Sequence, residues 1–393
     1  MNILFLTSTF PRFKNDTQSP FVLEQAVAWR KAQPTDNVHV LAPHDRGAKT
    51  FEIIDGVVVH RFRYMFPTFF EKLAYPALLP NIRANFLLNT LIPFYIVSQI
   101  FSTLHLLRTE RIDTLYAHWF VPQGISAYIV LMVHKLYSSK RLRFIIHNHS
   151  SDVALLKKIP LFGLAILRTL VRSANVIFCV NSNLTNKITP LISTGTTKKT
   201  AVYTLPMGVS MRMQKQASIQ YDFTFIGRFV AKKGLDYFLD ALEDVQKQGL
   251  FPTVAIAGGP QNKHYIYRIA SIKNAHYVGF VQSDTKAALL GKSRYIVLPS
   301  ITSKGDVEGL PVVLLEALVA GVPIIASRDT NIELIPEWNT IQKQVHILKD
   351  PANTHEFATI LRICLHAGTS KSTRLKKYAW DNLINEYIQR VKN

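Results

Sequence analysis

Ten short apolar segments alternate with helical patterns along this chain, and this alternation constrains the fold more than any other feature. The first five segments are Ile3–Leu6, Val38–Leu41, Thr114–Ala117, Phe144–His147 and Val176–Val180, and the second five are Asp222–Ile226, Thr253–Ala257, Ala275–Val278, Tyr295–Leu298 and Val322–Ala326. Apolar strands separated by helices are typical of parallel sheets that helices cover on both faces. Two such sets predict an α/β chain with two doubly wound, Rossmann-like domains.

A Pro/Gly turn at Leu205–Val209 marks the expected boundary between these domains, because the polar segment Ser210–Gln220 follows it. We therefore expect an N-terminal domain over residues 1–205 and a C-terminal domain over residues 206–370. Residues 371–393 carry apolar side chains at helical spacing. This pattern predicts an amphipathic C-terminal helix that docks back on the first domain.

The composition fits a large folded core and a strongly basic surface. Of the 393 residues, 48% are hydrophobic, and the net charge is +20. Residues 1–200 hold 23 basic and 10 acidic side chains, a net charge of +13. Such a field attracts nucleic acid, anionic lipid or phosphorylated substrates, and composition does not choose among them. Two cysteines, Cys179 and Cys364, exclude a disulfide framework and favour a reducing compartment.

Two apolar segments need to be compared with a signal peptide or a membrane-spanning helix. The N-terminal Met1–Thr7 has no basic leader and is interpreted as a buried first strand, not a signal peptide. Ala84–Leu107 contains no charged residue, but its Asn, Pro, Gln and His residues favour a buried or interfacial helix over a membrane span. With the alternating basic and apolar residues of Lys157–Arg168, it fits either a surface that lies on anionic lipid or a buried core helix with solvated lysines.

The segment Gly227–Gly234 follows a predicted strand and precedes a helix that begins near Leu235. Its first glycine allows close approach of a ligand to the backbone, and a helix start favours an anion. Arg228 can bind a diphosphate as a fork and Lys233 as a point charge. The same residues also fit an ordinary solvated basic turn.

Two glutamates lie at the start of an apolar helix that follows the strand Tyr295–Leu298. Glu316 lies inside this helix, where a carboxylate needs a partner. Glu308 precedes the helix, whose first backbone N–H groups are free to hold phosphate oxygens. Alternatively, Glu308 is a charge that stabilises the N-terminus of the helix, and Glu316 belongs to a buried structural ion pair. Their spacing, together with Arg228 and Lys233, favours a binding site.

This pattern resembles the signature of glycosyltransferase family 4. The resemblance rests on the two glutamates around Gly309-Leu310-Pro311, on Gly321-Val322-Pro323-Ile324, on Gly227–Gly234, and on the loops Ala257–Pro260 and Tyr277–Phe280. It implies the GT-B fold, in which two Rossmann-like domains face each other across a cleft, and retaining transfer of a sugar from a nucleotide-diphosphate donor. It also implies that Arg228 and Lys233 bind the diphosphate, Glu308 the donor sugar, and Glu316 the ribose hydroxyls. The remaining donor-binding positions would be Gly227, Gly258, Gly279, Gly309, Leu310 and Pro311.

The first half resembles a bacterial exopolysaccharide subgroup of that family. The motifs are Thr9–Arg12, Asp16 and Ser19–Val22, the strand end Ala117–Gly124, and the turn His147–Asp152, in which Ser150 replaces a glycine. A Gly-Gly pair common among relatives is absent from the first motif. The resemblance implies that His149 approaches the donor sugar from across the cleft, and that Asp16, His118 and Asp152 lie on the acceptor side of the N-terminal domain.

The implied catalytic residues are His149, Arg228, Lys233 and Glu308, with no enzyme nucleophile. The leaving diphosphate oxygen would accept the acceptor's proton while the two cations stabilise its charge. Asp306 and Glu308 have metal-binding spacing, but the diphosphate already has two cations, so we expect no cofactor and no required metal. The resemblance implies a saccharide or lipid-linked acceptor in cell-surface polysaccharide synthesis. We expect a cytoplasmic protein, with peripheral contact with the anionic inner face of the cell membrane as one option.

Other functions are compatible with parts of this pattern. A sugar-nucleotide epimerase would bind the same donor but need no acceptor. A non-catalytic nucleotide-sugar-binding relative would bind without reacting, although the four intact charged residues argue against it. A nucleic-acid-binding protein fits the basic charge, but the basic residues are not interleaved with exposed aromatics in a recognisable module.

Overall fold

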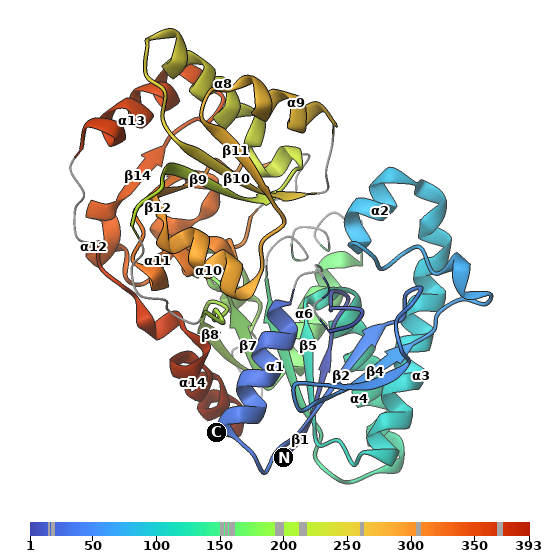
Figure 1. Ribbon diagram of the computed structural model, residues 1–393. Helices are drawn as coiled ribbons and strands as arrows, with labels where there is room; N and C mark the ends of the chain where they lie inside the picture. Colours follow the sequence, from blue (N-terminus) through green and yellow to red (C-terminus); the bar gives the residue numbers. More distant parts are fainter. Residues whose placement is uncertain are drawn as a thin grey trace. The chain divides into compact units, whose positions relative to one another are not determined.

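The computed structural model divides into two compact units, which are described separately. It describes residues 1–14, 16, 20–149, 153, 156, 162–192, 200–211, 218–259, 263–303, 308–367 and 372–393. The first unit consists of Met1–Met207 and Leu383–Asn393, and the second of Gly208–Asn382. Each unit is built on one mainly parallel sheet covered by helices (Figure 1). The predicted α/β class is therefore confirmed.

The first unit contains an eight-stranded sheet in the order β3-β4-β2-β1-β5-β6-β7-β8. Its strands are β1 (Asn2–Leu6), β2 (Asn37–Pro43), β3 (Phe51–Ile54), β4 (Val57–Phe62), β5 (Thr114–His118), β6 (Arg143–Asn148), β7 (Val176–Cys179) and β8 (Ala201–Thr204). All pairs are parallel except β3 with β4, which form an antiparallel hairpin around Asp55 and Gly56. The five predicted strands are confirmed, whereas β3, β4 and β8 were not predicted.

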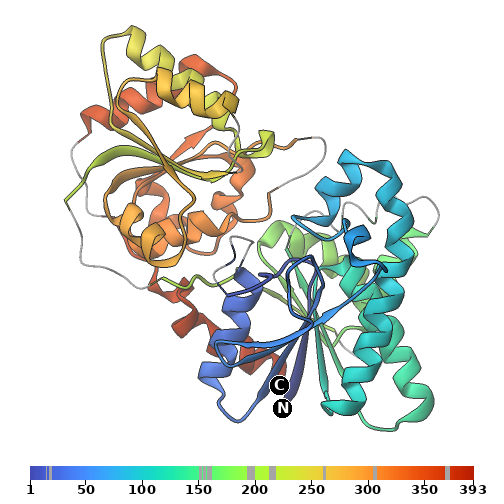
Figure 2. The ribbon, with the colours of Figure 1, turned by 45° about the vertical axis from the view of Figure 1, so that its right-hand side comes forward.

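Helices pack on this sheet, most of them in the connections between its strands and α14 at the end of the chain. They are α1 (Phe21–Ala32), α2 (Leu78–Ala84), α3 (Ile92–Thr109), α4 (Ile125–Tyr137), α6 (Gly163–Ser173), α7 (Ser182–Ile188) and α14 (Trp380–Lys392). Figures 1 and 2 show α3 and α4 lying side by side in this unit. The central strands are almost completely buried, so their apolar side chains form the core.

The end of the chain returns to the first unit through α14. The Tyr387 hydroxyl donates to the carbonyl oxygens of Leu205 and Pro206, which lie 3.0 and 2.9 Å away. Residues 372–382, by contrast, stay with the second unit, where Leu375 and Tyr378 enter the apolar core. The expectation that all of 371–393 docks on the first domain is therefore wrong for residues 372–382, because Leu375 and Tyr378 pack in the apolar core of the second unit.

The second unit contains a six-stranded sheet in the order β11-β10-β9-β12-β13-β14, with parallel pairing throughout. Its strands are β9 (Tyr221–Arg228), β10 (Val254–Gly259), β11 (Ala275–Gly279), β12 (Ser293–Leu298), β13 (Ile324–Ser327) and β14 (Val345–Leu348). Its helices are α8 (Leu235–Lys247), α9 (Lys263–Ser271), α10 (Ser283–Gly291), α11 (Val312–Ala320), α12 (Trp338–Ile341) and α13 (Thr354–His366). One apolar core includes α10 and α11, and a second includes α8, α9 and α13.

Two glycines allow the loops of the second unit to approach each other closely. Gly258 has φ +142°, and a Cβ atom there would lie 1.7 Å from the carbonyl oxygen of Gly227 on the neighbouring strand. Gly234 has φ +69°, and its Cβ would lie 1.9 Å from the carbonyl oxygen of Pro299. No L side chain fits at either position. The turn after β9 is thereby packed directly against the backbone at the ends of β10 and β12.

Replacing Gly258 with alanine should destabilise the second unit by on the order of 3–5 kcal/mol, since backbone strain and steric overlap add. Gly249 is a matched control, because it has φ +82° but open space around it. Gly249→Ala should cost only about 1–2 kcal/mol. Urea denaturation of the two variants tests this difference, and equal losses of unfolding free energy would contradict it.

Candidate active site

The charged residues predicted in the second unit follow the carboxyl ends of two neighbouring strands. Arg228 is the exposed last residue of β9, and Lys233 lies in the short 3₁₀ turn before α8. Glu308 follows β12 and precedes α11. The backbone N–H of Ile301 donates to the carbonyl oxygen of Lys232 at 2.8 Å, which ties the two loops together. Parallel pairing of the strands thus brings Arg228, Lys233 and Glu308 to one edge of the sheet.

Glu308 is held as an anion between two lysines. Its Oε1 accepts a hydrogen bond from Lys233 Nζ, and its Oε2 lies 3.6 Å from Lys232 Nζ. Burial by itself would raise the pKa of Glu308, but the positive charges of Lys233 and Lys232 outweigh burial and lower it. The carboxylate therefore stays ionised at neutral pH and does not serve as a general acid.

The loop that carries Glu308 is fixed by Asn331. The side-chain Nδ2 of Asn331 donates to the carbonyl oxygens of Glu308 at 2.8 Å and Gly309 at 3.1 Å. Asn331 adopts a left-handed backbone with φ +59°, which asparagine tolerates better than most residues. Sequence reasoning missed Asn331, because its partners lie more than 20 positions away.

Glu316 is buried in α11 and forms an ion pair. Its Oε1 lies 2.5 Å from Lys286 Nζ of α10, while its Oε2 is buried and has no hydrogen-bond donor in the described part of the chain. The ion-pair alternative for Glu316 is therefore observed. An unsatisfied buried carboxylate oxygen is costly, so this atom is available to a ligand hydroxyl. Lys286 was not predicted, since a lysine on an ordinary helix gives no local signal.

The other predicted donor-binding residues lie near the carboxyl ends of the strands or at the start of α11. Gly279 ends β11 with φ +77° and has open space where a Cβ would be. Leu310 is half-buried, and Pro311 is the N-cap residue of α11. No side chain caps that helix, so its N-terminus can accept an anion. Gly227 and Gly258 pair with each other across β9 and β10.

In the first unit, His118 ends β5, His149 follows the neighbouring β6, and their side chains are hydrogen-bonded. His118 Nδ1 lies 2.9 Å from His149 Nε2, so one imidazole N–H donates to the other ring. His147 stacks on His149 with ring centroids 4.3 Å apart. Its Nδ1 lies 3.1 Å from the hydroxyl of Tyr116. His147 is thus a satisfied core residue, as the less specific interpretation of this histidine predicts.

Burial keeps this cluster neutral. It lowers the pKa of His149 to about 3 and the pKa values of His118 and His147 well below 6.5. Repulsion from the neighbouring imidazoles adds to this effect at His118 and His147. His149 therefore offers a neutral imidazole, whose tautomer depends on its hydrogen bond to His118.

The nitrogen atoms of His118, His147 and His149 lie within 4.8 Å of one another, which raises the question of a metal. A metal ion lies in the plane of each imidazole that coordinates it, at about 2.0–2.1 Å from nitrogen. The three rings are stacked with interplanar angles of 14–23° and centroids 4.3–5.5 Å apart, so one ion cannot lie close to all three ring planes at metal-ligand distance. The cluster in this conformation fits a hydrogen-bonded support for His149 better than a metal site.

The predicted acceptor-side residues take different places. His118 is completely buried, so its side chain supports His149 and cannot itself meet an acceptor. Asp16 is also buried, and its carboxylate accepts from Arg12 Nε at 2.8 Å and Nη2 at 3.0 Å. Asp16 therefore holds the partly exposed Arg12 side chain in place, and Arg12 can contact an acceptor. Sequence reasoning did not single out Arg12 as a candidate. Asp152 lies outside the described residues, as does Asp306.

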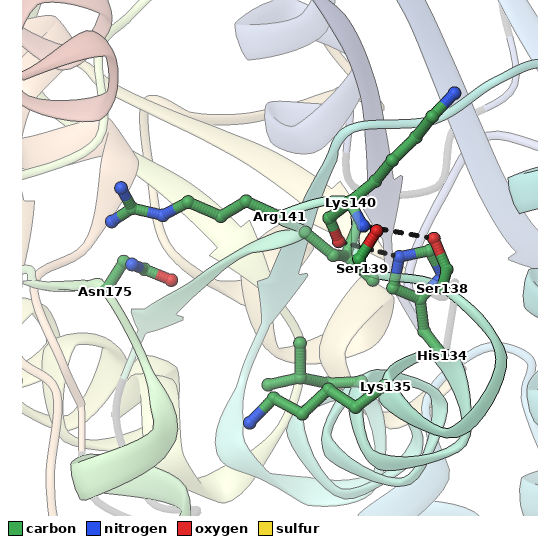
Figure 3. Close-up of a pocket in the computed structure, with 9 residues that line it drawn as sticks. His134, Lys135, Ser138, Ser139, Lys140, Arg141 and Asn175 are labelled. Atoms are coloured by element: carbon green, nitrogen blue, oxygen red, sulfur yellow. Dashed lines mark hydrogen bonds between the residues drawn. The ribbon is translucent and has the colours of Figure 1, made fainter.

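A cavity of about 490 Å³ lies elsewhere in the first unit (Figure 3). It is lined by Leu131, His134, Lys135, Ser138, Ser139, Lys140, Arg141, Leu142 and Asn175. These residues lie near the amino ends of β6 and β7, whereas Arg228, His118 and His149 lie at or just after carboxyl ends of strands. Its lining contains no predicted site residue, so we do not assign the active site to this cavity.

The chain is similar in sequence to known glycosyltransferases. Residues 220–366 match the family described as Glycosyl transferases group 1. A putative colanic acid biosynthesis glycosyltransferase of Escherichia coli (strain K12) is 30% identical over 197 residues, which cover 48% of each chain. An uncharacterized glycosyltransferase of Methanocaldococcus jannaschii is 24% identical over 71% of this chain and 75% of its own length. The match thus spans about half the length of the first relative and three quarters of the second.

A solved structure supports the fold over the whole chain. The Anabaena protein crystallised with UDP and glucose aligns with a TM-score of 0.62 and 14% identity, over 100% of this chain and 99% of that one. At this identity the likeness concerns the fold alone. The two Rossmann-like domains of the GT-B type, which the sequence resemblance implies, are therefore confirmed.

The histidine cluster should make the first unit sensitive to acid. The folded imidazoles bind protons less readily than unfolded ones, so the unfolded state takes up more protons between about pH 6.5 and 3 and stability falls as the pH falls. The loss is at most about 1.4 kcal/mol per pH unit for each histidine. His149→Gln should flatten this slope in urea denaturation at about pH 7.5 and 5.5. His355→Asn, at an exposed position on α13, is the control, and equal slopes in both variants would contradict the prediction.

Proposed function

Because residues 220–366 form a glycosyl transferases group 1 domain, we propose that this chain is a retaining glycosyltransferase. It transfers a sugar from a UDP- or GDP-linked donor to a saccharide or lipid-linked acceptor. The name of the Escherichia coli relative supports a role in cell-surface polysaccharide synthesis. The Anabaena structure with UDP and glucose supports a nucleotide-diphosphate sugar as donor.

The observation that carries this proposal is the arrangement of Arg228, Lys233 and Glu308 at the ends of β9 and β12. Arg228 is exposed at the strand end, and the ammonium of Lys233 has three N–H donors. Lys233 can keep its hydrogen bond to Glu308 while it donates another to a phosphate oxygen. The uncapped N-terminus of α11 adds partial positive charge beside them. Together these groups suit a diphosphate.

The chemistry follows from the charges. As the bond between the sugar and the diphosphate breaks, negative charge develops on the leaving oxygen, and Arg228 and Lys233 stabilise it. The acceptor's hydroxyl oxygen bonds to the anomeric carbon on the face that the diphosphate leaves, and the leaving oxygen takes the hydroxyl proton. Because the bond forms on that same face, the configuration is retained. Glu308, whose pKa is lowered, stays charged and binds the sugar as a hydrogen-bond acceptor. No step requires a metal ion or another cofactor.

Glu316 and His149 have supporting roles in this proposal. The free Oε2 of Glu316 accepts hydrogen bonds from the ribose hydroxyls, while Lys286 holds Oε1 and keeps the carboxylate oriented. In the first unit, His149 offers a neutral ring nitrogen to a sugar hydroxyl. A lipid-linked acceptor would place the protein at the inner face of the cell membrane.

The function is tested with a panel of UDP-, GDP- and ADP-sugars, each scored by thermal shift and by slow hydrolysis of the donor. We expect one nucleotide series to stabilise the protein and to be hydrolysed at the anomeric carbon with retained configuration. EDTA should leave both readouts unchanged. If no donor stabilises the protein, the proposal fails. An isomerised nucleotide sugar would indicate an epimerase, and binding without any reaction a non-catalytic relative.

Removing either cation should slow the transfer itself. Lys233→Ala and Arg228→Ala should each lower kcat by about 100–1,000-fold, because each loses a charge that acts on the leaving diphosphate. Lys247→Ala, at the last residue of α8, removes the same charge away from the site and should change kcat by less than about twofold. Steady-state kinetics with the donor found in the panel provide the measurement. A loss confined to KM would contradict the leaving-group role.

A further inference from the structure

Helix α3 carries apolar side chains on its exposed side as well as on its buried side. Phe94, Val97 and Phe101 are exposed, while the buried side combines Tyr95, Leu106 and Leu107 with the polar Gln99 and Thr103. Neither side-chain amide atom of Gln99 has a hydrogen-bond partner in the described part of the chain. A helix in water normally turns its apolar side inward. The outer side of α3 is therefore suited to an apolar environment.

The residues before α3 extend this apolar surface. We define the aromatic surface as Phe66, Phe69, Phe70, Phe86, Leu87, Phe94, Val97 and Phe101, all of which are exposed. Phe66 and Phe86 are 86% and 81% exposed, so folding within this chain hides little of them. Exposed apolar residues gathered in this number mark an interaction surface.

Hydrogen bonds link the residues of the segment from position 63 to 109, which carries the aromatic surface. The Ser98 hydroxyl of α3 donates to the carbonyl oxygen of Arg63, just after β4. The Asn81 side chain of α2 donates to the carbonyl oxygens of Leu73 and Tyr75, at 3.0 and 2.7 Å. Figures 1 and 2 show α2 at the N-terminal end of α3. The aromatic side chains are therefore presented by an ordered structure.

The position of this segment is set by the sheet. It begins at the carboxyl end of β4, which runs parallel to β5 and β6 through β2 and β1. His118 ends β5 and His149 follows β6, so they lie at the same edge of the first unit's sheet. The start of the aromatic surface thus shares that edge with the candidate site residues of this unit.

The basic side chains of the segment from position 63 to 109 indicate an anionic partner for the aromatic surface. Arg63, Lys72, Arg83 and Arg108 are exposed. Glu71 is the only acidic residue from position 63 to 109, and it is buried, with Oε2 2.5 Å from His44 Nδ1. Cations around an apolar surface fit the anionic headgroups of a bilayer. The same cations would repel each other if two copies met through this surface.

The segment fits a position in the membrane interface and not across the bilayer. Phe86–Thr109 is long and apolar enough to cross a membrane by length and composition, with a mean hydropathy of 1.4 and 28% of its most apolar window buried. However, Tyr95, Leu106 and Leu107 are buried in this unit, and α3 packs along α4, β2 and β4. A span would require all these contacts to break. The alternative of a fully buried core helix is contradicted by the exposed aromatic residues.

We propose that the aromatic surface inserts into the interface of an anionic bilayer and holds the first unit there with its candidate site edge near the lipid headgroups. This placement would also bring the site to a lipid-linked acceptor, and that part of the proposal rests on the proposed transferase function. Membrane binding itself does not.

The proposal is tested by sedimentation of the full chain with vesicles, in the absence of any donor. The probe vesicles are phosphatidylcholine alone and phosphatidylcholine with about 30% phosphatidylglycerol. A fourfold serine variant at Phe66, Phe86, Leu87 and Phe101 should bind the anionic vesicles at least about 100-fold more weakly than the unchanged chain. The matched control carries serine at Ile53, Phe251, Tyr267 and Ile363, which are also exposed, and should bind unchanged.

A variant with fewer basic residues and a measurement of the oligomeric state complete the test. Gln at Arg63, Lys72 and Arg83 should lower binding to anionic vesicles about tenfold or more and leave the binding to neutral vesicles unchanged. The proposal is overturned if the chain does not sediment with anionic vesicles, or if the serine variant and its control bind equally. It is also overturned if light scattering shows a dimer that the serine variant alone disrupts. Thermal shift with nucleotide sugars on the same variants reports donor binding separately, so a failed function and a failed membrane surface give different results.

Discussion

Parallel pairing of strands is the constraint on which the functional features of this molecule depend. Each parallel connection must cross a face of the sheet before the next strand begins, so the loops that leave the carboxyl ends gather at one edge. In the second unit this places Lys233 and Glu308, 75 positions apart, in contact. In the first unit it places His118 beside His149. Backbone fit then decides how close the loops come, and Gly258 and Gly234 permit distances that any side chain would prevent.

The parts of the fold that could be predicted are those whose cause is local. Ten strands were recognisable because their apolar runs are short and continuous. The β3–β4 hairpin was missed although Asp55-Gly56 between two apolar runs is a strong turn signal. Arg228, Lys233, Glu308 and Glu316 stood out because their residue types and spacing carry the chemistry. The partners Lys286 and Asn331 could not be found in the same way, since tertiary packing brings them to their contacts. Arg12 lies only four residues from its partner Asp16 and was missed although that contact is local.

The two units treat charge in opposite ways. In the second unit, charged groups are paired at partly buried positions, and the pairing of Glu308 with Lys233 keeps the pKa of Glu308 low, so that its carboxylate stays ionised. In the first unit, imidazoles are kept neutral by burial and by their neighbours. Fixed positive charge suits the diphosphate of the proposed donor, whereas sugar hydroxyls can be bound by carboxylates such as Glu308 and by neutral imidazoles alike. The second unit thus offers ionic contacts to a ligand, and the first unit offers neutral hydrogen-bonding groups.

The return of α14 to the first unit has a consequence for how the chain is made. A ribosome releases residues 1–207 and then the whole second unit before Leu383–Asn393 emerges. Until then, His147 and the backbone at Leu205 lack Tyr387, and Asp36 lacks Lys392. The second unit, whose residues are contiguous, can therefore finish folding before the first, although domains usually complete in the order of synthesis. Until α14 is made, the first unit leaves exposed the apolar surface that this helix later covers. A chaperone that binds apolar surface would act on the chain during that interval.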